Sequence, residues 1–274
     1  MLRRNLARFA IAALVAALAA TPAAADWSLL NLPRGVSELS REIYGLHMLM
    51  LSICTTIAVV TFGAMTVALL RFRKSQGAVA DTSLVHDSRL ELVWTVIPVL
   101  ILVGMAVPAV ARILHIEDMS GSELTIKVTG YQWQWHYEYL GRDVAFFSRL
   151  ARSSDFARQP GSGIDPATVE NYLLDVDRPL VVPTGTKVRL LLTANDVIHA
   201  WWVPQFGMKR DAIPGFINEM WFRIDADRPG TYRGQCAELC GADHGFMPIV
   251  VVAKSPAEFV AWLEQQRATL ARPE

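Results

Sequence analysis

Two long apolar runs constrain this chain more than any other feature of its sequence. Residues 48–70 and residues 92–111 are uncharged runs of 23 and 20 residues. A helix of about 20 apolar residues crosses the hydrocarbon core of a bilayer. The second run contains Pro98 and Pro108, which a spanning helix tolerates where neighbouring protein or water satisfies the freed carbonyl groups. The sequence therefore predicts a pair of membrane-spanning helices, and two buried helices of a soluble protein are the weaker alternative.

Basic residues around the two runs predict how the helices are oriented. The loop between the runs contains four basic residues and the segment before the first run contains two. They are Arg71, Arg73, Lys74 and Arg89 in the loop, and Arg34 and Arg41 before the first run. Because cytoplasmic loops are enriched in Lys and Arg, this loop is expected in the cytoplasm. Both ends of the mature chain are then expected on the periplasmic side of the inner cell membrane.

Residues 1–25 have the pattern of a secretory signal peptide. Three arginines precede an apolar stretch at residues 9–20, and three alanines follow directly before Asp26. The apolar stretch is too short to cross a bilayer, so an uncleaved first membrane helix is the less favoured alternative. A cleaved export signal predicts the same orientation as the basic loop does.

After Arg112 the sequence changes to short stretches bounded by Gly, Pro, Asn and Asp, which favour turns. The predicted strands are residues 124–129, 131–139, 180–182, 187–193, 220–224, 230–234 and 248–253. Strands at this spacing predict an antiparallel β-sandwich or barrel. Residues 140–178 are expected to form a long connection with one short helical turn, and residues 256–270 a closing helix. The predicted parts are thus a signal peptide (1–25), a membrane hairpin (26–112) and a periplasmic β-domain (113–274).

Charge and cysteine content exclude other classes of protein. The chain has 26 basic and 26 acidic residues, and its formal net charge is zero. It therefore lacks the basic field by which proteins bind nucleic acid. Its three cysteines are too few for a disulfide scaffold, and Cys236 and Cys240 are four residues apart. This spacing favours a metal site or a redox pair.

The segment at residues 236–247 combines two thiols, an imidazole and a thioether. They belong to Cys236, Cys240, His244 and Met247, and His199 lies 37 residues before the first of them. Soft sulfur ligands together with imidazole favour copper over magnesium or calcium. Zinc is the competing metal, but structural zinc sites generally have four Cys or His ligands and no thioether. A disulfide between the two cysteines of an exported domain is the alternative without a metal.

Five motifs, in this order and behind two predicted spans, resemble those of subunit II of cytochrome c oxidases. They are Glu91-Leu-Val-Trp94-Thr-Val-Ile-Pro98, Gly130-Tyr-Gln-Trp133-Gln-Trp135, Asp196-Val-Ile-His199-Ala-Trp201, Asp211-Ala-Ile-Pro214-Gly215 and the segment at residues 236–247. The resemblance begins near residue 36. It implies two transmembrane helices followed by a cupredoxin-like Greek-key barrel with a dinuclear copper A centre. A nitrous or nitric oxide reductase domain and a membrane-tethered copper-transfer protein are the rival assignments.

The resemblance also implies a role for individual residues. The implied copper ligands are His199, Cys236, Glu238, Cys240, His244 and Met247. The two cysteines bridge the copper ions, and Glu238 contributes its backbone carbonyl. The Glu238 carboxylate is expected to face a magnesium ion shared with subunit I.

The implied function is electron transfer from cytochrome c to the haem of subunit I, where oxygen reduction is coupled to proton pumping. Trp133 is the implied site of electron input and Glu91 an implied site of proton uptake. From position alone, Glu91 is instead an interfacial acid that pairs with Arg89 or extends to water. The implied partners are cytochrome c, subunit I, further oxidase subunits and membrane lipid, with no nucleic acid.

This chain departs from the family pattern around the expected docking surface. Glu138, Asp143 and Asp196 are acids that would attract a basic cytochrome. The loop at residues 141–159, however, carries four arginines against two aspartates. Phe216 stands where relatives commonly have arginine. The charge of the electron donor is therefore left open by the sequence.

Overall fold

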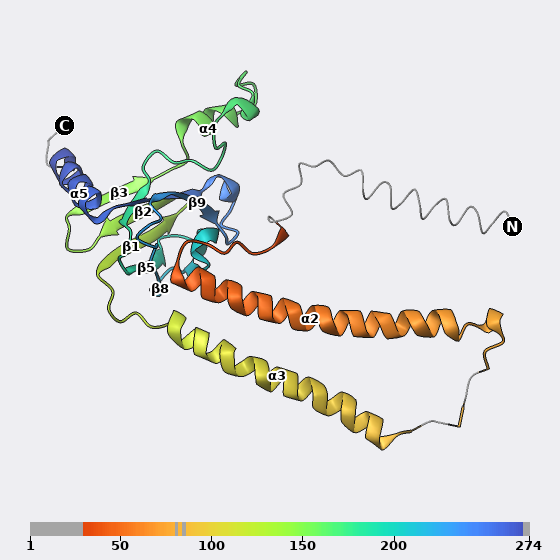
Figure 1. Cartoon of the computed structure of the whole chain (residues 1–274). Coiled ribbons are helices and arrows are strands. Elements are labelled where there is room, and N and C mark those ends of the chain that lie inside the picture. Colours follow the sequence, from red (N-terminus) through yellow and green to blue (C-terminus); the bar gives the residue numbers. More distant parts are fainter. Residues whose placement is uncertain (1–29, 80–81, 84–85, 271–274) are drawn as a thin grey trace. The chain divides into compact units, whose positions relative to one another are not determined.

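The computed structural model describes residues 30–79, 82–83 and 86–270 (Figure 1). The predicted signal peptide lies outside these residues. The chain divides into two compact units, residues 1–33 and residues 34–274. The helices and strands described below all belong to the second unit.

Two long helices correspond to the two apolar runs. They are α2 (Glu38–Arg71) and α3 (Ser88–Ile116), of 34 and 29 residues. At 1.5 Å per residue, each exceeds the ~30 Å hydrocarbon core of a bilayer. Ser37 begins α2 with a capping box, and Asp87 caps α3 by accepting hydrogen bonds from the backbone amides of Arg89 and Leu90. Both helices are long and apolar enough to cross a membrane, and their apolar windows have no residue buried within the chain.

Within the described residues, ten strands form two five-stranded sheets. The first sheet has the order β3-β2-β1-β5-β8, and the second has the order β4-β10-β9-β6-β7. The strands of the first sheet are β1 (Leu124–Tyr131), β2 (Gln134–Tyr139), β3 (Val144–Ser148), β5 (Val188–Ala194) and β8 (Asn218–Phe222). The strands of the second sheet are β4 (Leu180–Pro183), β6 (His199–Trp202), β7 (Lys209–Ala212), β9 (Gly230–Cys236) and β10 (Pro248–Lys254). The predicted all-β domain is confirmed.

The pairing of the strands is mixed, whereas the sequence predicted an antiparallel arrangement. β1 pairs with β5 and β4 pairs with β10 in parallel, and the other pairs are antiparallel. The chain crosses from the first sheet to the second between β3 and β4, and back to the first between β4 and β5. Each crossing strand therefore joins a partner distant in sequence, and such connections allow parallel pairs. The long connection predicted at 140–178 contains β3 and a short helix, α4 (Arg152–Ala157).

The core lies between the two sheets. Every second residue of β5 is buried, as expected for a strand with one face toward a core. The largest fully buried side chains include Trp135, Trp201, Trp221, Tyr137, Phe206 and Phe222. The closing helix α5 (Pro256–Leu270) buries Phe259 and Leu263 against the same core. Burial of each such side chain contributes about 1.5–3 kcal/mol, so the core holds the strand ends rigidly.

The end of α3 is attached to the β-domain by side chains of the first sheet. Trp221 donates its indole hydrogen to the backbone carbonyl of Ile116 at 3.0 Å. Lys187 donates to the carbonyls of Asp118 and Ser120 at 2.8 and 2.7 Å, and its ammonium lies 4.1 Å from the centre of the Trp221 ring. These bonds satisfy carbonyl groups at and beyond the end of the helix, where intrahelical partners are missing.

Candidate metal centre

The strand pairing brings His199 to the segment at residues 236–247. Cys236 is the last residue of β9 and His199 is the first residue of β6. These strands pair with Trp201 opposite Cys236, and Ala237 continues the contact by donating to the carbonyl of Ala200 at 3.0 Å. The backbone amide of Cys236 also donates to the Met247 carbonyl at 3.0 Å, which closes the segment into a loop. We call residues 236–247 the ligand loop.

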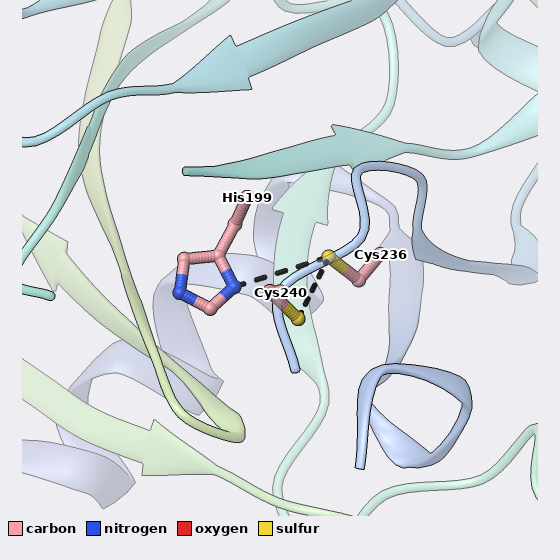
Figure 2. Close-up of side chains that lie close together, drawn as sticks. All are labelled: His199, Cys236 and Cys240. Carbon is pink, nitrogen blue, oxygen red and sulfur yellow. Dashed lines mark hydrogen bonds between the residues drawn. The ribbon is translucent and has the colours of Figure 1, made fainter. Parts of the chain in front are cut away.

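Figure 2 shows the two thiols and the His199 imidazole pointing toward one another. The Sγ atom of Cys236 lies 3.9 Å from His199 Nδ1 and 3.9 Å from Cys240 Sγ. His199, Cys236 and Cys240 are all buried, and their ligand atoms lie within 4.8 Å of one another. The cysteines are separate thiols, far from the sulfur–sulfur bond length of about 2.05 Å in a disulfide.

The separations suit metal ligands. The two sulfur atoms are 3.9 Å apart, so one metal ion could contact both through metal–thiolate bonds of about 2.3 Å. Two sulfurs and one imidazole nitrogen also match the soft ligand set that copper prefers. The described residues therefore fit the copper ions that the sequence predicted.

The remaining predicted ligands lie on the same loop. His244 Nδ1 is 3.5 Å from Cys240 Sγ, at the start of a short helical turn (His244–Phe246). The backbone carbonyl of Glu238 lies 3.4 Å from Cys236 Sγ, while the Glu238 side chain is exposed. Met247 is buried at the end of the loop. A carbonyl and a second imidazole are thus next to the thiol pair.

The electrostatics of the cluster favour one thiolate. Burial, the largest single effect, raises the pKa of Cys236, but its hydrogen bonds with His199, with the Glu238 and Ala200 backbone and with His244 together outweigh burial, and the pKa is lowered. Burial and then the charge of Cys236 raise the pKa of Cys240. Burial tends to lower the pKa of His199, but Cys236 and Asp196 raise it. Because metals bind the thiolate form, Cys236 is the cysteine that is better prepared for a metal.

Trp133 lies in the turn between β1 and β2, not on a single strand with Trp135 as the sequence predicted. We call residues 132 and 133 the Trp133 turn. Gln132 Nε2 and Trp133 Nε1 both donate to the Cys240 carbonyl, at 2.9 and 3.2 Å. Trp133 is half-buried. Its indole therefore links the surface to the ligand loop.

Two glycines allow this close packing. A Cβ atom on Gly130 would lie 2.7 Å from His199 Cδ2, so a side chain there would displace the imidazole. Gly241 has a φ of +119° and its added Cβ would lie 3.0 Å from Gln132 Nε2. That backbone conformation strongly favours glycine. The glycines were not singled out from the sequence because their role depends on neighbours distant in the chain.

Glu91 lies apart from these groups, in the first turn of α3. His86 Nδ1 is 2.7 Å from Glu91 Oε1, so the neighbour of this carboxylate is His86 and not the expected Arg89. Both side chains are well exposed within the chain. The acid is therefore accessible at the N-terminal end of the second apolar helix.

A cavity of about 430 Å³ adjoins Trp133. Its charged lining residues are Arg149, Arg152, Asp155, Arg158, Asp177 and Asp243. Arg158 lies 2.8 Å from Asp155 and 3.5 Å from Asp243, and its guanidinium lies 4.4 Å from the centre of the Phe246 ring. The α4 segment is thereby attached to the ligand loop. The balance of three cations and three anions differs from a purely acidic docking surface.

Together these observations define a class of protein. The β-domain consists of two sheets. Its soft ligands lie on the ligand loop, just before the last strand β10, and on the neighbouring strand β6. This is the arrangement of a cupredoxin-like metal domain. In this chain the domain follows two helices of membrane-spanning length.

Comparison with known proteins identifies the family. Residues 25–111 match the transmembrane domain of cytochrome c oxidase subunit II, and residues 124–254 match its periplasmic domain. The chain belongs to the cytochrome c oxidase subunit II family. It is 41% identical over 233 residues to a probable cytochrome c oxidase subunit 2 of Rickettsia prowazekii, covering 85% of this chain and 71% of the relative.

Two further relatives extend the comparison. The cytochrome c oxidase subunit 2 of Cereibacter sphaeroides is 35% identical over 271 residues, covering 91% of this chain and 88% of the relative. The solved periplasmic domain of subunit II of cytochrome oxidase from Bradyrhizobium japonicum is 41% identical with a TM-score of 0.47. It matches over 56% of this chain and 100% of that domain.

Proposed function

We propose that this chain is the electron-accepting subunit of a cytochrome c oxidase. It takes electrons singly from cytochrome c and delivers them to the haem of subunit I, where oxygen reduction is coupled to proton pumping. One observation supports this proposal most directly. Two thiols and two imidazoles form a chain of contacts of 3.5–3.9 Å, and the half-buried Trp133 is hydrogen-bonded to the same loop.

The ligand set proposed for a dinuclear copper A centre is His199, Cys236, Glu238, Cys240, His244 and Met247. When bound, a copper pair supplies reversible one-electron oxidation and reduction. The two thiolates, the two imidazoles, the thioether and the Glu238 carbonyl would hold the copper ions. Strand ends and backbone hydrogen bonds hold these residues, so they move little when the charge of the site changes. The exposed Glu238 carboxylate is proposed to bind a magnesium ion shared with subunit I.

Trp133 is proposed to receive the electron from cytochrome c. Its side chain is half-buried, and its Nε1 hydrogen is bonded to the Cys240 carbonyl at 3.2 Å. The path from the surface to a ligand residue therefore contains one hydrogen bond and no gap for solvent. This contact is the feature of the structure that distinguishes Trp133 from the buried Trp135, which belongs to the core.

The proposed setting is the inner cell membrane. A signal peptide at 1–25 is removed, residues 26–112 form the membrane hairpin, and residues 113–274 form the periplasmic copper domain. Both ends of the mature chain then lie on the periplasmic side, and the loop between the helices is cytoplasmic. In this orientation Glu91 lies at the cytoplasmic boundary, where it is proposed to collect protons for a channel in subunit I. Subunit I, further oxidase subunits and lipid surround the helices.

The copper content of the purified full-length chain tests this function. We expect two copper ions per chain and an electron paramagnetic resonance spectrum of one unpaired electron shared between both nuclei. A single, easily removed copper ion would instead indicate a copper-transfer protein. A chain that binds no copper under conditions that keep both thiols reduced would overturn the proposal.

A further inference from the structure

Asp196 is an acid that the sequence placed among the residues expected to attract a cytochrome, but its carboxylate is directed to other groups. The residue lies between β5 and β6, and about a quarter of its side chain is exposed. Its Oδ1 atom is 2.9 Å from His199 Nε2 and accepts from the Val197 amide at 2.7 Å. Its Oδ2 atom accepts from the Gln132 amide at 2.7 Å. Both oxygens therefore have partners within the chain.

The first of these contacts determines which nitrogen of His199 faces the thiols. A carboxylate only accepts hydrogen bonds, so the nitrogen that faces it must carry the hydrogen. Nε2 is that nitrogen, and the lone pair of Nδ1 is then directed toward Cys236 Sγ at 3.9 Å. Such a partner commonly fixes both the tautomer and the ring orientation of a metal-binding histidine.

The second contact reaches the other functional segment. Gln132 begins the Trp133 turn, and both residues of this turn donate to the Cys240 carbonyl. The turn is thus bonded to the ligand loop on one side and to Asp196 on the other. Because Gln132 and Asp196 are separated by 64 positions in the sequence, no local structure could hold them together.

The charges around Asp196 support an internal role. In the part of the chain that the structure describes, no Lys or Arg forms an ion pair with it; its partners are His199 and two backbone amides. A carboxylate that accepts several such bonds is held in one orientation.

We infer that Asp196 is a positioning residue that holds His199 and the Trp133 turn in one fixed relation. One carboxylate orients a metal ligand through Oδ1 and the electron-receiving turn through Oδ2. The inference rests on the proposed function for the roles of His199 and Trp133. It adds a residue that is not itself a proposed metal ligand and that orients both His199 and the Trp133 turn.

Two substitutions separate the two contacts. In Asp196→Asn, the amide oxygen still accepts from the Gln132 amide, but the amide nitrogen donates toward His199 Nε2 and opposes its hydrogen. In Asp196→Ala, both contacts are lost. Asp143→Asn is the matched control, because this exposed acid lies in the turn between β2 and β3 and its φ of +55° is one that asparagine tolerates.

Copper retention and amide hydrogen exchange give independent measurements on the full-length chain. Loss of a hydrogen-bond partner of a metal-binding histidine typically weakens metal affinity about 10–100-fold. We expect a loss of that size in competition with a chelator for both Asp196 variants, and none for Asp143→Asn. In the metal-free chain, we expect the Gln132 amide to exchange faster in Asp196→Ala and at the wild-type rate in Asp196→Asn.

The two measurements also distinguish this inference from the proposed function. If the wild-type chain binds no copper, the proposed function fails, and the exchange measurement still decides whether Asp196 holds the Trp133 turn. If both Asp196 variants match Asp143→Asn in copper retention and in exchange, the inference is wrong whatever the wild-type chain binds. The isosteric Asn variant guards against a result caused by misfolding of the Ala variant.

Discussion

The helical hairpin and the β-domain of this chain use their residues in different ways. In α2 and α3 the backbone hydrogen bonds are internal and the apolar windows have no side chain buried within the chain. In the β-domain, large aromatic residues are fully buried and a Cβ atom added to Gly234 would lie 2.0 Å from the Trp202 carbonyl oxygen. The structure of the hairpin therefore depends on its apolar composition, whereas the structure of the β-domain depends on the close packing of individual residues.

Replacement of a bridging cysteine is expected to have the largest effect. In Cys240→Ser, the site loses a thiolate that lies 3.9 Å from Cys236 Sγ and 3.5 Å from His244 Nδ1. We expect complete loss of the two-copper spectrum, measured by electron paramagnetic resonance and by copper analysis. Cys54→Ser in α2 is the matched control and should leave both unchanged, since Cys54 is an exposed residue of an apolar helix. Retention of two coppers in Cys240→Ser would refute the bridging role.

A pair of glycine substitutions compares the two regions with the same chemical change. Gly130→Ala places a methyl group 2.7 Å from His199 Cδ2, whereas Gly63→Ala in α2 meets no atom within 4 Å. Overpacking of this kind typically costs about 1–3 kcal/mol. We expect that loss in thermal unfolding of the metal-free Gly130→Ala chain, together with weaker copper retention.

Gly63→Ala is expected to leave stability unchanged or to raise it by up to about 1 kcal/mol, because alanine favours the helix. Equal effects of the two substitutions would show that the hairpin packs as tightly as the β-domain. The difference described here between the hairpin and the β-domain would then be wrong.

The parts of the fold that depend on local sequence could be predicted, and the parts that depend on contacts between distant segments could not. The two helices follow from unbroken apolar runs, and the family motifs imply the cupredoxin-like domain. The parallel pairing of β1 with β5 could not be predicted, because it depends on a crossover between sheets and not on the composition of either strand. The strand β3 was missed because residues 144–148 lie in a connection whose polar and glycine-rich parts dominate the pattern.

The site shows the same division between local and distant contacts. Cys236, Cys240, His244 and Met247 are close in sequence, so their grouping is visible without a structure. The contact of Asp196 with Gln132 and the clamp of Arg158 on Asp243 join segments more than sixty positions apart. The local sequence contains no signal for either contact, and the spacing of three residues between Asp196 and His199 alone does not show where the carboxylate points.

Replacement of Trp133 tests whether electron input at the surface of the β-domain also depends on a single residue. Trp133→Phe keeps an aromatic ring but removes the donor that bonds the Cys240 carbonyl at 3.2 Å. We expect the rate of electron transfer from reduced cytochrome c to fall at least severalfold, measured by stopped-flow absorption on the assembled oxidase. Copper content and subunit assembly should remain normal, because Gln132 Nε2 still donates to the same carbonyl. An unaltered rate would mean that electrons arrive through another residue.

The last prediction concerns Glu91, where the hairpin is expected to depend on a single residue. A carboxylate at a membrane boundary can exchange protons with water while it faces a channel in a partner subunit. Glu91 has the exposure for this, and its contact with His86 at 2.7 Å supplies a second group that can carry a proton. We expect Glu91→Gln to lower steady-state oxidase turnover severalfold. Copper content and the first electron transfer from cytochrome c should stay normal. Arg89→Gln is the control, since it changes charge two residues away without removing the carboxylate. If Glu91→Gln and Arg89→Gln turn over alike, Glu91 is an interfacial anchor, and the hairpin contributes only an apolar support for the copper domain.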